Sequence, residues 1–388
     1  MQELFALKLS ADTWILDLRL AAGIAALFAL GACGGHRSPG PPDTQEGSAK
    51  TLNIYSWADY IAPDTVANFE KETGIKVRYD TYESNEVLET KLLTGHTNYD
   101  VVLPTDTFFE RLLHTGTFQK LDKAALPNFA NLDPEIVQKL AVHDPGNRYA
   151  TPYLWTTVGI GYNVAKVQQR LGSDKFDSWS LIFDPKNAAR LQDCGITVID
   201  SPIDVFAAAL LFLGKDPNSR DAADTAAVED LLMKFRPFVR SIESQAYLGE
   251  FANGSLCVAL GWSGDIIQAR SRALEAGNGV KINYFVPREG SMIIVDMMAV
   301  PIDAPHPKEA MLWLNYLMRP EVMAGITNAV KYPNGNHAAL TLVTDSLRED
   351  PVVYPGSEVR ARLHSLIMAP PAYTRQVTRV WTRFRTGE

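Results

Sequence analysis

Hydrophobic and polar positions alternate between strand-like and helix-like patterns from Thr51 onward. The stretch "TLNIYSW" is a short apolar strand, and "APDTVANFEKETG" has the spacing of a helix that ends at Gly74. "IKVRYDTY" alternates as a strand does, "SNEVLETKLLTG" predicts a helix between Ser84 and Gly95, and "YDVVLP" predicts a buried strand. Strands and helices that alternate at this length predict an α/β fold with a largely parallel sheet, covered on both faces.

The same pattern returns in the second half of the chain. Predicted strands there are "CGITVIDSP", "SLCVALGW", "INYFVP" and "MIIVDMMAVP", with helices in "DVFAAALLFLG" and "DIIQARSRALEAG". The intervening "YATPYLWTTVGIGYN" is extended, apolar and nearly uncharged, which indicates a segment crossing between two lobes. A second crossing is expected near residues 270–282. We therefore predict a first lobe from 51–152 and 275–338, and a second from 153–274 and 339–388.

An apolar stretch from Leu20 to Ala32 follows Arg19 and is too short to span a bilayer comfortably, but it suits a signal-peptide core. It ends in "LGAC", which resembles a lipobox. Residues 1–32 are therefore predicted to be a lipoprotein signal peptide, with Cys33 as the lipid-modified first residue. A plain secretory signal is the alternative, and either one exports the protein. Residues 33–50, rich in Gly, Pro and Ser, predict a flexible tether. We expect a periplasmic protein that meets the membrane only through its lipid anchor.

Composition narrows the class of partner. The chain has 388 residues, enough for two domains of ordinary size. Its net charge of −8 argues against nucleic acid as a partner. A modestly acidic surface favours a cationic partner instead. The two cysteines beyond the signal, Cys194 and Cys257, suggest a disulfide in an exported protein, with two separately buried thiols as the alternative.

Acidic and aromatic residues gather in the turns after the predicted strands, where open parallel sheets bind their ligands. The turns read "SWADY", "LPTDTF", "IDSPID" and "GWSGD", and a later strand contains "IIVDMM". The residues concerned are Trp57, Asp59, Tyr60, Thr105, Asp106, Thr107, Asp200, Asp204, Trp262, Asp265 and Asp296. Carboxylates pair with ammonium groups, and each tryptophan face adds about 0.5–2 kcal/mol of cation–π attraction. A diammonium ligand needs carboxylates at two ends with aromatic rings between, so this set predicts a cage for a polyamine.

Ordinary structural roles compete with that interpretation. An aspartate in a strand-to-helix turn is most often an N-cap, and either tryptophan could belong to the core. Asp296 differs because it interrupts an apolar strand, where a charge is costly unless it is paired. Catalytic motifs are weaker: "GWSGD" has Asp265 where a nucleophile elbow needs glycine, "VGIGYN" lacks the third glycine of a dinucleotide loop, and the seven histidines have no metal-ligand spacing. We expect no catalytic residue, metal or cofactor.

Long stretches of the chain resemble the periplasmic putrescine/spermidine-binding proteins of bacterial polyamine ABC transporters. They include "YSWADYIAPDTVANFEKETGIKVRYDTYESNEVLE", "DKAALPNFANLDPE", "TTVGIGYNV", "LGKDPNS", "GWSGD" and "LNYLMRP". The resemblance implies a two-lobed type II periplasmic binding protein with a ligand cleft between the lobes. It also implies a monomer that binds a polyamine and delivers it to an ABC permease in the inner membrane.

Position by position, the resemblance implies a ligand site and a disulfide. The site residues are Trp57, Asp59, Tyr60, Thr105, Thr107, Asp204, Trp262, Asp265, Asp296 and Tyr332, and the disulfide joins Cys194 to Cys257. Some positions depart from the family: Ala58 stands where serine is common, Ile294 where Phe or Trp is usual, and Asp106 where a small uncharged residue is usual. These departures leave the preferred amine open. A binding or sensing protein for another cationic amine, or a periplasmic enzyme acting on an amine, is the alternative.

Overall fold

The computed structural model describes residues 50–173 and 175–388. The predicted signal peptide, the lipobox cysteine Cys33 and the tether up to residue 49 lie outside these residues. The strands are β1 Thr51–Trp57, β2 Lys76–Tyr82, β3 Val101–Val102, β4 Ala150–Asn163, β5 Ile196–Val198, β6 Ser241–Ile242, β7 Val258–Trp262, β8 Ile282–Phe285, β9 Ser291–Ala299 and β10 Leu363–His364.

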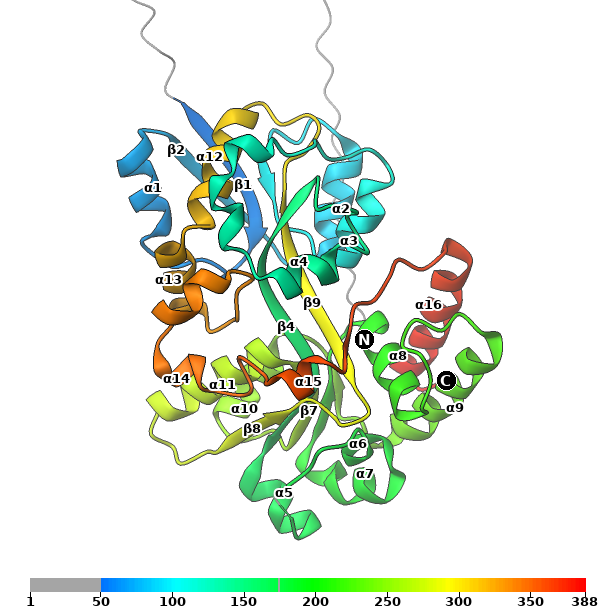
Figure 1. Ribbon diagram of the computed structural model, residues 1–388. Coiled ribbons are helices and arrows are strands. Elements are labelled where there is room, and N and C mark those ends of the chain that lie inside the picture. Colours follow the sequence, from blue (N-terminus) through cyan, green and yellow to red (C-terminus); the bar gives the residue numbers. More distant parts are fainter. Residues whose placement is uncertain (1–49, 174) are drawn as a thin grey trace, which may run out of the picture. The chain divides into compact units, whose positions relative to one another are not determined.

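The α-helices connect and cover these strands (Figure 1). They are α1 Thr65–Thr73, α2 Asn85–Thr94, α3 Asp106–Leu113, α4 Pro134–Leu140, α5 Val164–Leu171, α6 Ser180–Phe183, α7 Pro185–Leu191, α8 Pro202–Phe212, α9 Ala222–Phe235, α10 Ala246–Ala252, α11 Ser263–Glu275, α12 Pro307–Leu317, α13 Pro320–Val330, α14 Asp345–Arg348, α15 Ser357–Arg360 and α16 Pro371–Thr386.

The first elements form where the pattern predicts them, and their ends have local causes. Helix α1 ends at Gly74, which adopts φ 71°, a left-handed conformation that glycine takes without steric cost. Helix α2 begins after Ser84, whose hydroxyl accepts a hydrogen bond from the backbone N–H of Val87. Apolar residues that alternate with polar ones then bury one face of β1, including Leu52 and Ile54.

The sheet order is β2-β1-β3-β9-β4-β7-β5-β6, with β8 beside β4 and β10 beside β9. Strand β1 pairs in parallel with β2 and β3, and β5 pairs in parallel with β6 and β7. Strands β4 and β9 run antiparallel to each other, and β4 is also antiparallel to β7 and β8. The prediction of a largely parallel sheet is therefore wrong at the centre, because the chain passes between the two parallel groups on long strands and not through helical crossovers.

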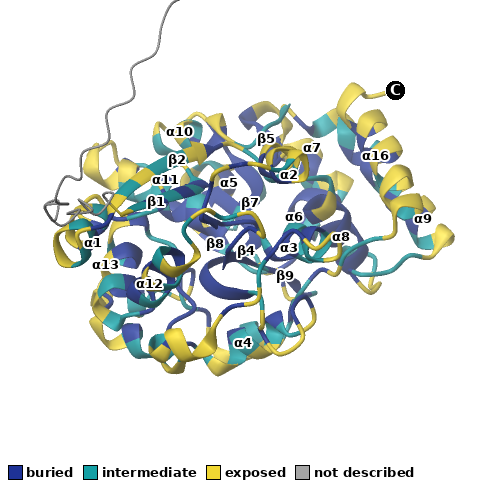
Figure 2. Ribbon diagram, turned by 90° about the horizontal axis from the view of Figure 1, so that it is seen from above, coloured by how far each residue is buried: buried dark blue, intermediate teal, exposed yellow. Residues whose placement is uncertain are grey.

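Strand β4 joins these two groups. Its residues 150–157 pair with β9, and its residues 158–163 pair with β7 and β8. Every residue of β4 is buried, and Figure 2 shows it in the dark blue interior, whereas much of α16 is exposed. We call β1, β2, β3, β9 and the first part of β4 sheet one. The second part of β4 with β5, β6, β7 and β8 is sheet two.

The division of the chain into two lobes stays a prediction, but the strand pairing bears on its boundaries. Strand β8, which lies within the predicted first lobe (275–338), pairs with the second part of β4 in sheet two. Strand β9, a few residues later, pairs with the first part of β4 in sheet one. The chain thus changes from sheet two to sheet one between β8 and β9, whereas the sequence places the second crossing near residues 270–282.

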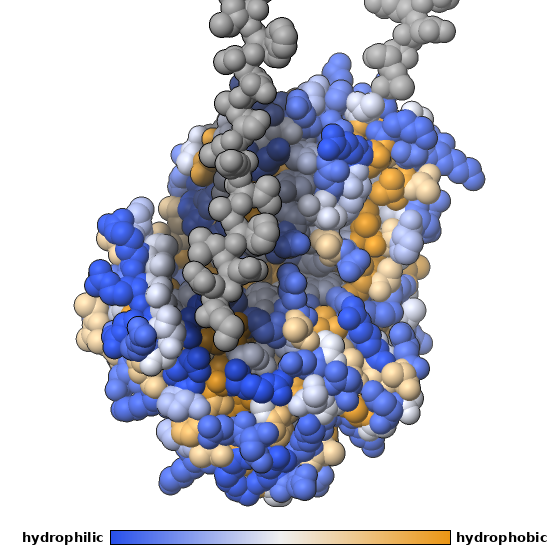
Figure 3. All heavy atoms as spheres, turned by 180° about the vertical axis from the view of Figure 1, so that it is seen from behind, coloured by the Kyte–Doolittle hydropathy of each residue, from blue (hydrophilic) through white to orange (hydrophobic). Residues whose placement is uncertain are grey.

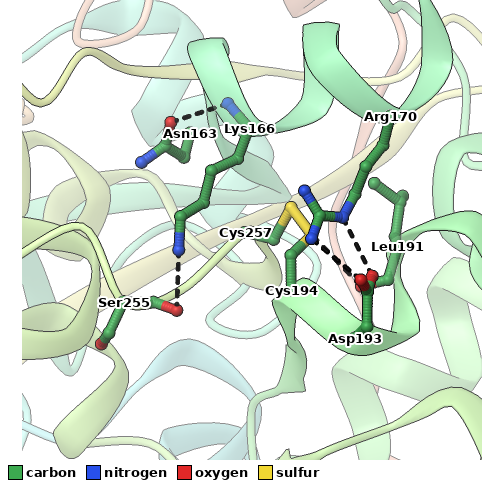
Figure 4. Close-up of a disulfide and its surroundings, with 8 residues drawn as sticks. All are labelled: Asn163, Lys166, Arg170, Leu191, Asp193, Cys194, Ser255 and Cys257. Atoms are coloured by element: carbon green, nitrogen blue, oxygen red, sulfur yellow. Dashed lines mark hydrogen bonds and ion pairs between the residues drawn. A yellow bond between two sulfur atoms is a disulfide. The ribbon is translucent and has the colours of Figure 1, made fainter.

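A disulfide between Cys194 and Cys257 ties the starts of β5 and β7, with the two Cα atoms 5.3 Å apart. Both residues are buried, and the ion pair of Arg170 with Asp193 lies beside them (Figure 4). The two strands pair in parallel from Ile196 and Val258 onward. The cross-link thus fixes the relative position of two strands whose opposite ends lead to Asp204 and Trp262.

The face drawn in Figure 3 is mainly hydrophilic, with small hydrophobic patches between the polar residues. Within residues 50–173 and 175–388, no helix combines the length and the apolar character that crossing a membrane would require.

We predict that replacing both Cys194 and Cys257 with alanine lowers the free energy of unfolding by about 4 kcal/mol. The physical reason is the chain entropy of the unfolded state, since the cross-link spans 63 residues. Urea unfolding of the double variant measures the change, with the disulfide-bonded wild type as the reference. A loss below about 1 kcal/mol would contradict the prediction.

Candidate ligand-binding site

Asp296 lies in the middle of β9 and is 7% exposed. Its Oδ2 accepts a hydrogen bond of 2.6 Å from the hydroxyl of Tyr60, while its Oδ1 is buried and has no hydrogen-bond partner in the described structure. Tyr60 is held in turn by Tyr153 on β4, whose hydroxyl donates to the Tyr60 carbonyl at 2.8 Å. The sequence singled out Asp296 because it interrupts an apolar strand, and the structure leaves half of its carboxylate unsatisfied.

Asp265 lies in the first turn of α11, directly after β7. Two tyrosine hydroxyls donate to its carboxylate: Tyr247 to Oδ2 and Tyr332 to Oδ1, each at 2.7 Å. Gly264 allows this approach, since a Cβ at that position would lie 2.1 Å from the ring of Tyr332. The sequence predicted Asp265 and Tyr332 but missed Tyr247, which comes from α10.

The two acid–tyrosine groups meet through an aromatic contact. The rings of Tyr60 and Tyr332 pack edge to face with their centroids 5.2 Å apart, a favourable geometry for aromatic pairs. Tyr60 follows β1 of sheet one, whereas Asp265 follows β7 of sheet two. Tyr60 thus contacts Asp296 and Tyr332, both more than two hundred residues later in the chain. The four side chains form a continuous series with Asp296 and Asp265 at its ends and the rings of Tyr60 and Tyr332 between them.

Asp204 and Trp262 form a second contact on the side of sheet two. Asp204 lies in the first turn of α8 and is buried. Its Oδ2 accepts hydrogen bonds from the hydroxyl of Ser201 at 2.8 Å and from the indole N–H of Trp262 at 3.2 Å. Because Trp262 ends β7 and Asp265 follows three residues later, this pair borders the Asp265 group.

The remaining predicted residues come from sheet one. The indole N–H of Trp57 donates to the Leu103 carbonyl at 3.0 Å, and its ring packs on Tyr82. Asp59 is exposed, with φ 52°. Thr105 forms an isolated antiparallel bridge with Asp296, and Thr107 follows it on α3. Thr105 is therefore close to Asp296, whereas Asp59 is not among the residues that the described contacts bring together.

Burial shifts the ionisation of the acids. Removal from water raises the pKa of Asp296 to about 7, and the hydrogen bond from Tyr60 partly opposes this rise. Burial raises the pKa of Asp204 to about 6, and it also raises the pKa of Asp265. Desolvation disfavours the charged form of each acid, so each gains from any positive charge placed next to it.

Two surface hollows lie elsewhere and contain none of the predicted site residues. One, of about 280 Å³, is lined by α1, α12 and α13 residues that include Asp64, Glu72 and Arg319. The other, of about 370 Å³, is lined by residues that include Phe183, Phe212 and Leu231. Among the described residues, no group of three or more His, Cys, Asp or Glu side chains is arranged to hold a metal ion.

Comparison with known proteins gives the family. A family model for bacterial extracellular solute-binding proteins matches residues 64–353, which is most of the chain. This chain belongs to that family. The resemblance drawn from the sequence and the predicted two-lobed binding-protein fold class are confirmed by this match and by the relatives and the solved structure that follow.

Relatives of this solute-binding protein carry names that describe binding, not catalysis. It is 52% identical over 341 residues to the putrescine-binding periplasmic protein PotF of Escherichia coli, covering 87% of this chain and 92% of the relative. It is 43% identical over 346 residues to a putrescine/agmatine-binding protein of Pseudomonas aeruginosa, covering 89% and 94%.

A solved structure agrees on the fold. The spermidine/putrescine ABC transporter substrate-binding protein PotD of Streptococcus pneumoniae superposes with a TM-score of 0.75 at 26% identity, over 87% of this chain and 99% of that one.

We predict that Asp296→Asn stabilises the ligand-free solute-binding protein at pH 8. The pKa of Asp296 rises on folding from 3.8 to about 7, so the folded state binds this proton more tightly than the unfolded state, and stability falls as pH rises from about 4 to about 7. Asparagine does not ionise and avoids the cost, which we expect to be about 4 kcal/mol at pH 8 and to shrink toward pH 5.

Thermal unfolding at pH 5 and pH 8 measures this difference. The matched control is Asp230→Asn, because Asp230 is an exposed α9 acid paired with Lys234. A variant that is no more stable than wild type at pH 8, or that keeps the same margin at both pH values, would contradict the prediction.

Proposed function

We propose that this protein captures a polyamine of the putrescine or spermidine type outside the cytoplasm and delivers it to an ABC permease. The observation that carries the proposal is the series from Asp296 to Asp265. Two buried or half-buried carboxylates stand at its ends, each held by a tyrosine hydroxyl, and two touching tyrosine rings separate them. A diammonium with an apolar stem has the complementary arrangement of charge and apolar surface.

Each part of such a ligand has a partner in this site. One ammonium would donate to the unpartnered Oδ1 of Asp296, and the other would pair with Asp265. The methylenes would pack on the tyrosine and tryptophan rings, with cation–π attraction at the ammonium ends. We further propose that Trp57, Asp59, Thr105, Thr107, Asp204 and Trp262 complete the wall of the site.

We propose that the tyrosine contacts belong to a closed arrangement of the proposed lobes. Tyr332, which follows α13, donates to Asp265 on α11. This hydrogen bond directly links the segment after α13 to the helix that follows β7 of sheet two. A ligand would enter after this contact opens. Closure then removes water from the acids, which strengthens their attraction for the ammonium groups.

Names of relatives support the class of ligand. The Escherichia coli relative is named for putrescine, and the Pseudomonas aeruginosa relative for putrescine and agmatine. Ala58 and Ile294 leave the preferred amine to experiment. A protein that binds or senses another cationic amine would have the same kind of site. An enzyme would be distinguished by converting the amine into a product.

We predict binding of at least one member of a panel of putrescine, cadaverine, spermidine, spermine and agmatine. Titration calorimetry should show a dissociation constant in the micromolar range or below, about −8 kcal/mol, which two ion pairs and several aromatic contacts can supply. Absence of binding by all five amines would overturn the polyamine proposal. Recovery of an altered amine after incubation would favour the enzyme.

Asp296→Asn should weaken the binding of whichever amine binds wild type by at least a hundredfold. The substitution removes the charge that the first ammonium neutralises, although its side-chain oxygen still accepts from Tyr60. Asp230→Asn again serves as the control, with unchanged affinity expected. Equal affinities in the Asp296 variant and wild type would remove Asp296 from the site.

We also propose a lipid anchor at Cys33 and a monomeric, periplasmic protein. The lipobox-like sequence "LGAC" that ends at Cys33 supports the anchor. Expression of the full chain with radiolabelled palmitate should label wild type, and Cys33→Ser should abolish the label and release the protein into the soluble periplasmic fraction. Unlabelled wild type in that fraction would support a plain secretory signal instead.

A further inference from the structure

A further buried acid, Asp106, lies beside Asp296. It begins α3 and is 2% exposed. Its Oδ1 accepts from the backbone N–H of Thr107 at 2.7 Å, and its Oδ2 accepts from the backbone N–H of Val295 at 3.1 Å. The preceding residue, Thr105, forms a β-bridge with Asp296. Thr105 and Asp106 are therefore both held against β9. The Asp106 carboxylate is thus fixed against the strand, one residue from the unsatisfied acid of the site.

The charge of Asp106 acts on two acids from different elements. It raises the pKa of Asp296 on β9 and that of Asp204 on α8, in addition to the larger effect of burial on both. Asp106 therefore lies within electrostatic reach of sheet one and of the Asp204–Trp262 pair. A cation that lies between these acids also experiences the charge of Asp106.

One imidazole stands on the other side of Asp106. His143 is buried, and its Nδ1 lies 2.9 Å from the Oε2 of Glu110. Its Nε2 lies 3.9 Å from the Oδ2 of Asp106 and has no hydrogen-bond partner in the described structure. A single histidine charge is thus shared between two carboxylates, which leaves this group with a net negative charge even when His143 is protonated.

We propose that Asp106 is a further specificity-determining residue, whose buried charge favours amines with three or more positive charges over diamines. The proposal rests on the proposed function. Asp296 and Asp265 match the two charges of a diamine, and Asp204 and Asp106 then remain as negative charges that a third ammonium would neutralise. Two backbone N–H groups already hold the Asp106 carboxylate in place, so no rearrangement is needed for it to act on a ligand.

Asp106→Asn tests the proposal, because its side-chain oxygen can still accept from Val295 while the charge is removed. We expect the ratio of the spermidine to the putrescine association constant, measured by calorimetry at pH 7, to fall at least threefold. The matched control is Asp144→Asn. Asp144 is also fully buried and accepts from two backbone N–H groups, those of Tyr149 and Ala150, but it is not among the site acids, so its ratio should stay at the wild-type value.

His143→Gln provides a change of opposite sign. It removes the positive charge that protonated His143 places next to Asp106, and its amide can still donate to Glu110. Burial opposes protonation of His143, but the hydrogen bond to Glu110 and the charge of Asp106 outweigh it and raise the pKa of the imidazole. We expect the spermidine-to-putrescine ratio to rise at least twofold, and this variant decides the question if Asp106→Asn does not fold. Equal losses of both amines in Asp106→Asn, or an unchanged ratio in His143→Gln, would overturn the role of Asp106. Wild type that binds none of the five amines would instead overturn the proposed function, and wild type that binds only diamines would overturn the role of Asp106.

Discussion

The cost of burying a carboxylate is the constraint on which this site depends. Asp296 lies inside a sheet where water does not compensate its charge, and one tyrosine hydroxyl satisfies one of its two oxygens. Such an acid is stable if it takes up a proton or if a cation reaches it. Neighbouring residues hold the tyrosine hydroxyls that donate to the acids in position. Tyr153 orients Tyr60, and the missing side chain at Gly264 makes room for Tyr332.

The same constraint explains which site residues the sequence reveals. A charge inside an apolar strand is a local anomaly, so Asp296 can be recognised from its neighbours alone. The acids after β5 and β7 are found because strand ends are predictable from hydrophobic patterns. The sequence around Tyr247 and Tyr153 contains no comparable anomaly. A tyrosine in a helix or a buried strand is ordinary, and its role appears only when a distant acid packs against its hydroxyl.

Long-range geometry limits the rest of the prediction. The individual strands follow from their patterns, but the directions in which β4 and β9 pair do not, because both parallel and antiparallel neighbours bury such apolar strands. The stretch "YSWADY" shows the same limit within one turn. Trp57 donates its indole N–H to a backbone carbonyl but also lies close enough to Asp296 to lower its pKa, Tyr60 donates to Asp296, and Asp59 is exposed. Residues of one turn that look equally suited to a cation thus differ in whether they reach the acid.

Proton and ammonium compete for the same acids. Burial raises the pKa of Asp106, Asp204, Asp265 and Asp296, so these acids take up protons more readily than exposed acids do, at the places where we propose that ammonium groups bind. Binding of a polyamine would then replace protons on these acids with ammonium groups, which are held at a fixed spacing by the apolar stem of the ligand. A proton can neutralise one acid at a time, whereas a polyamine in the proposed site would neutralise several and would also cover the tyrosine rings. Selectivity would then arise from the number and spacing of the acids, because a buried acid left without a cation is costly.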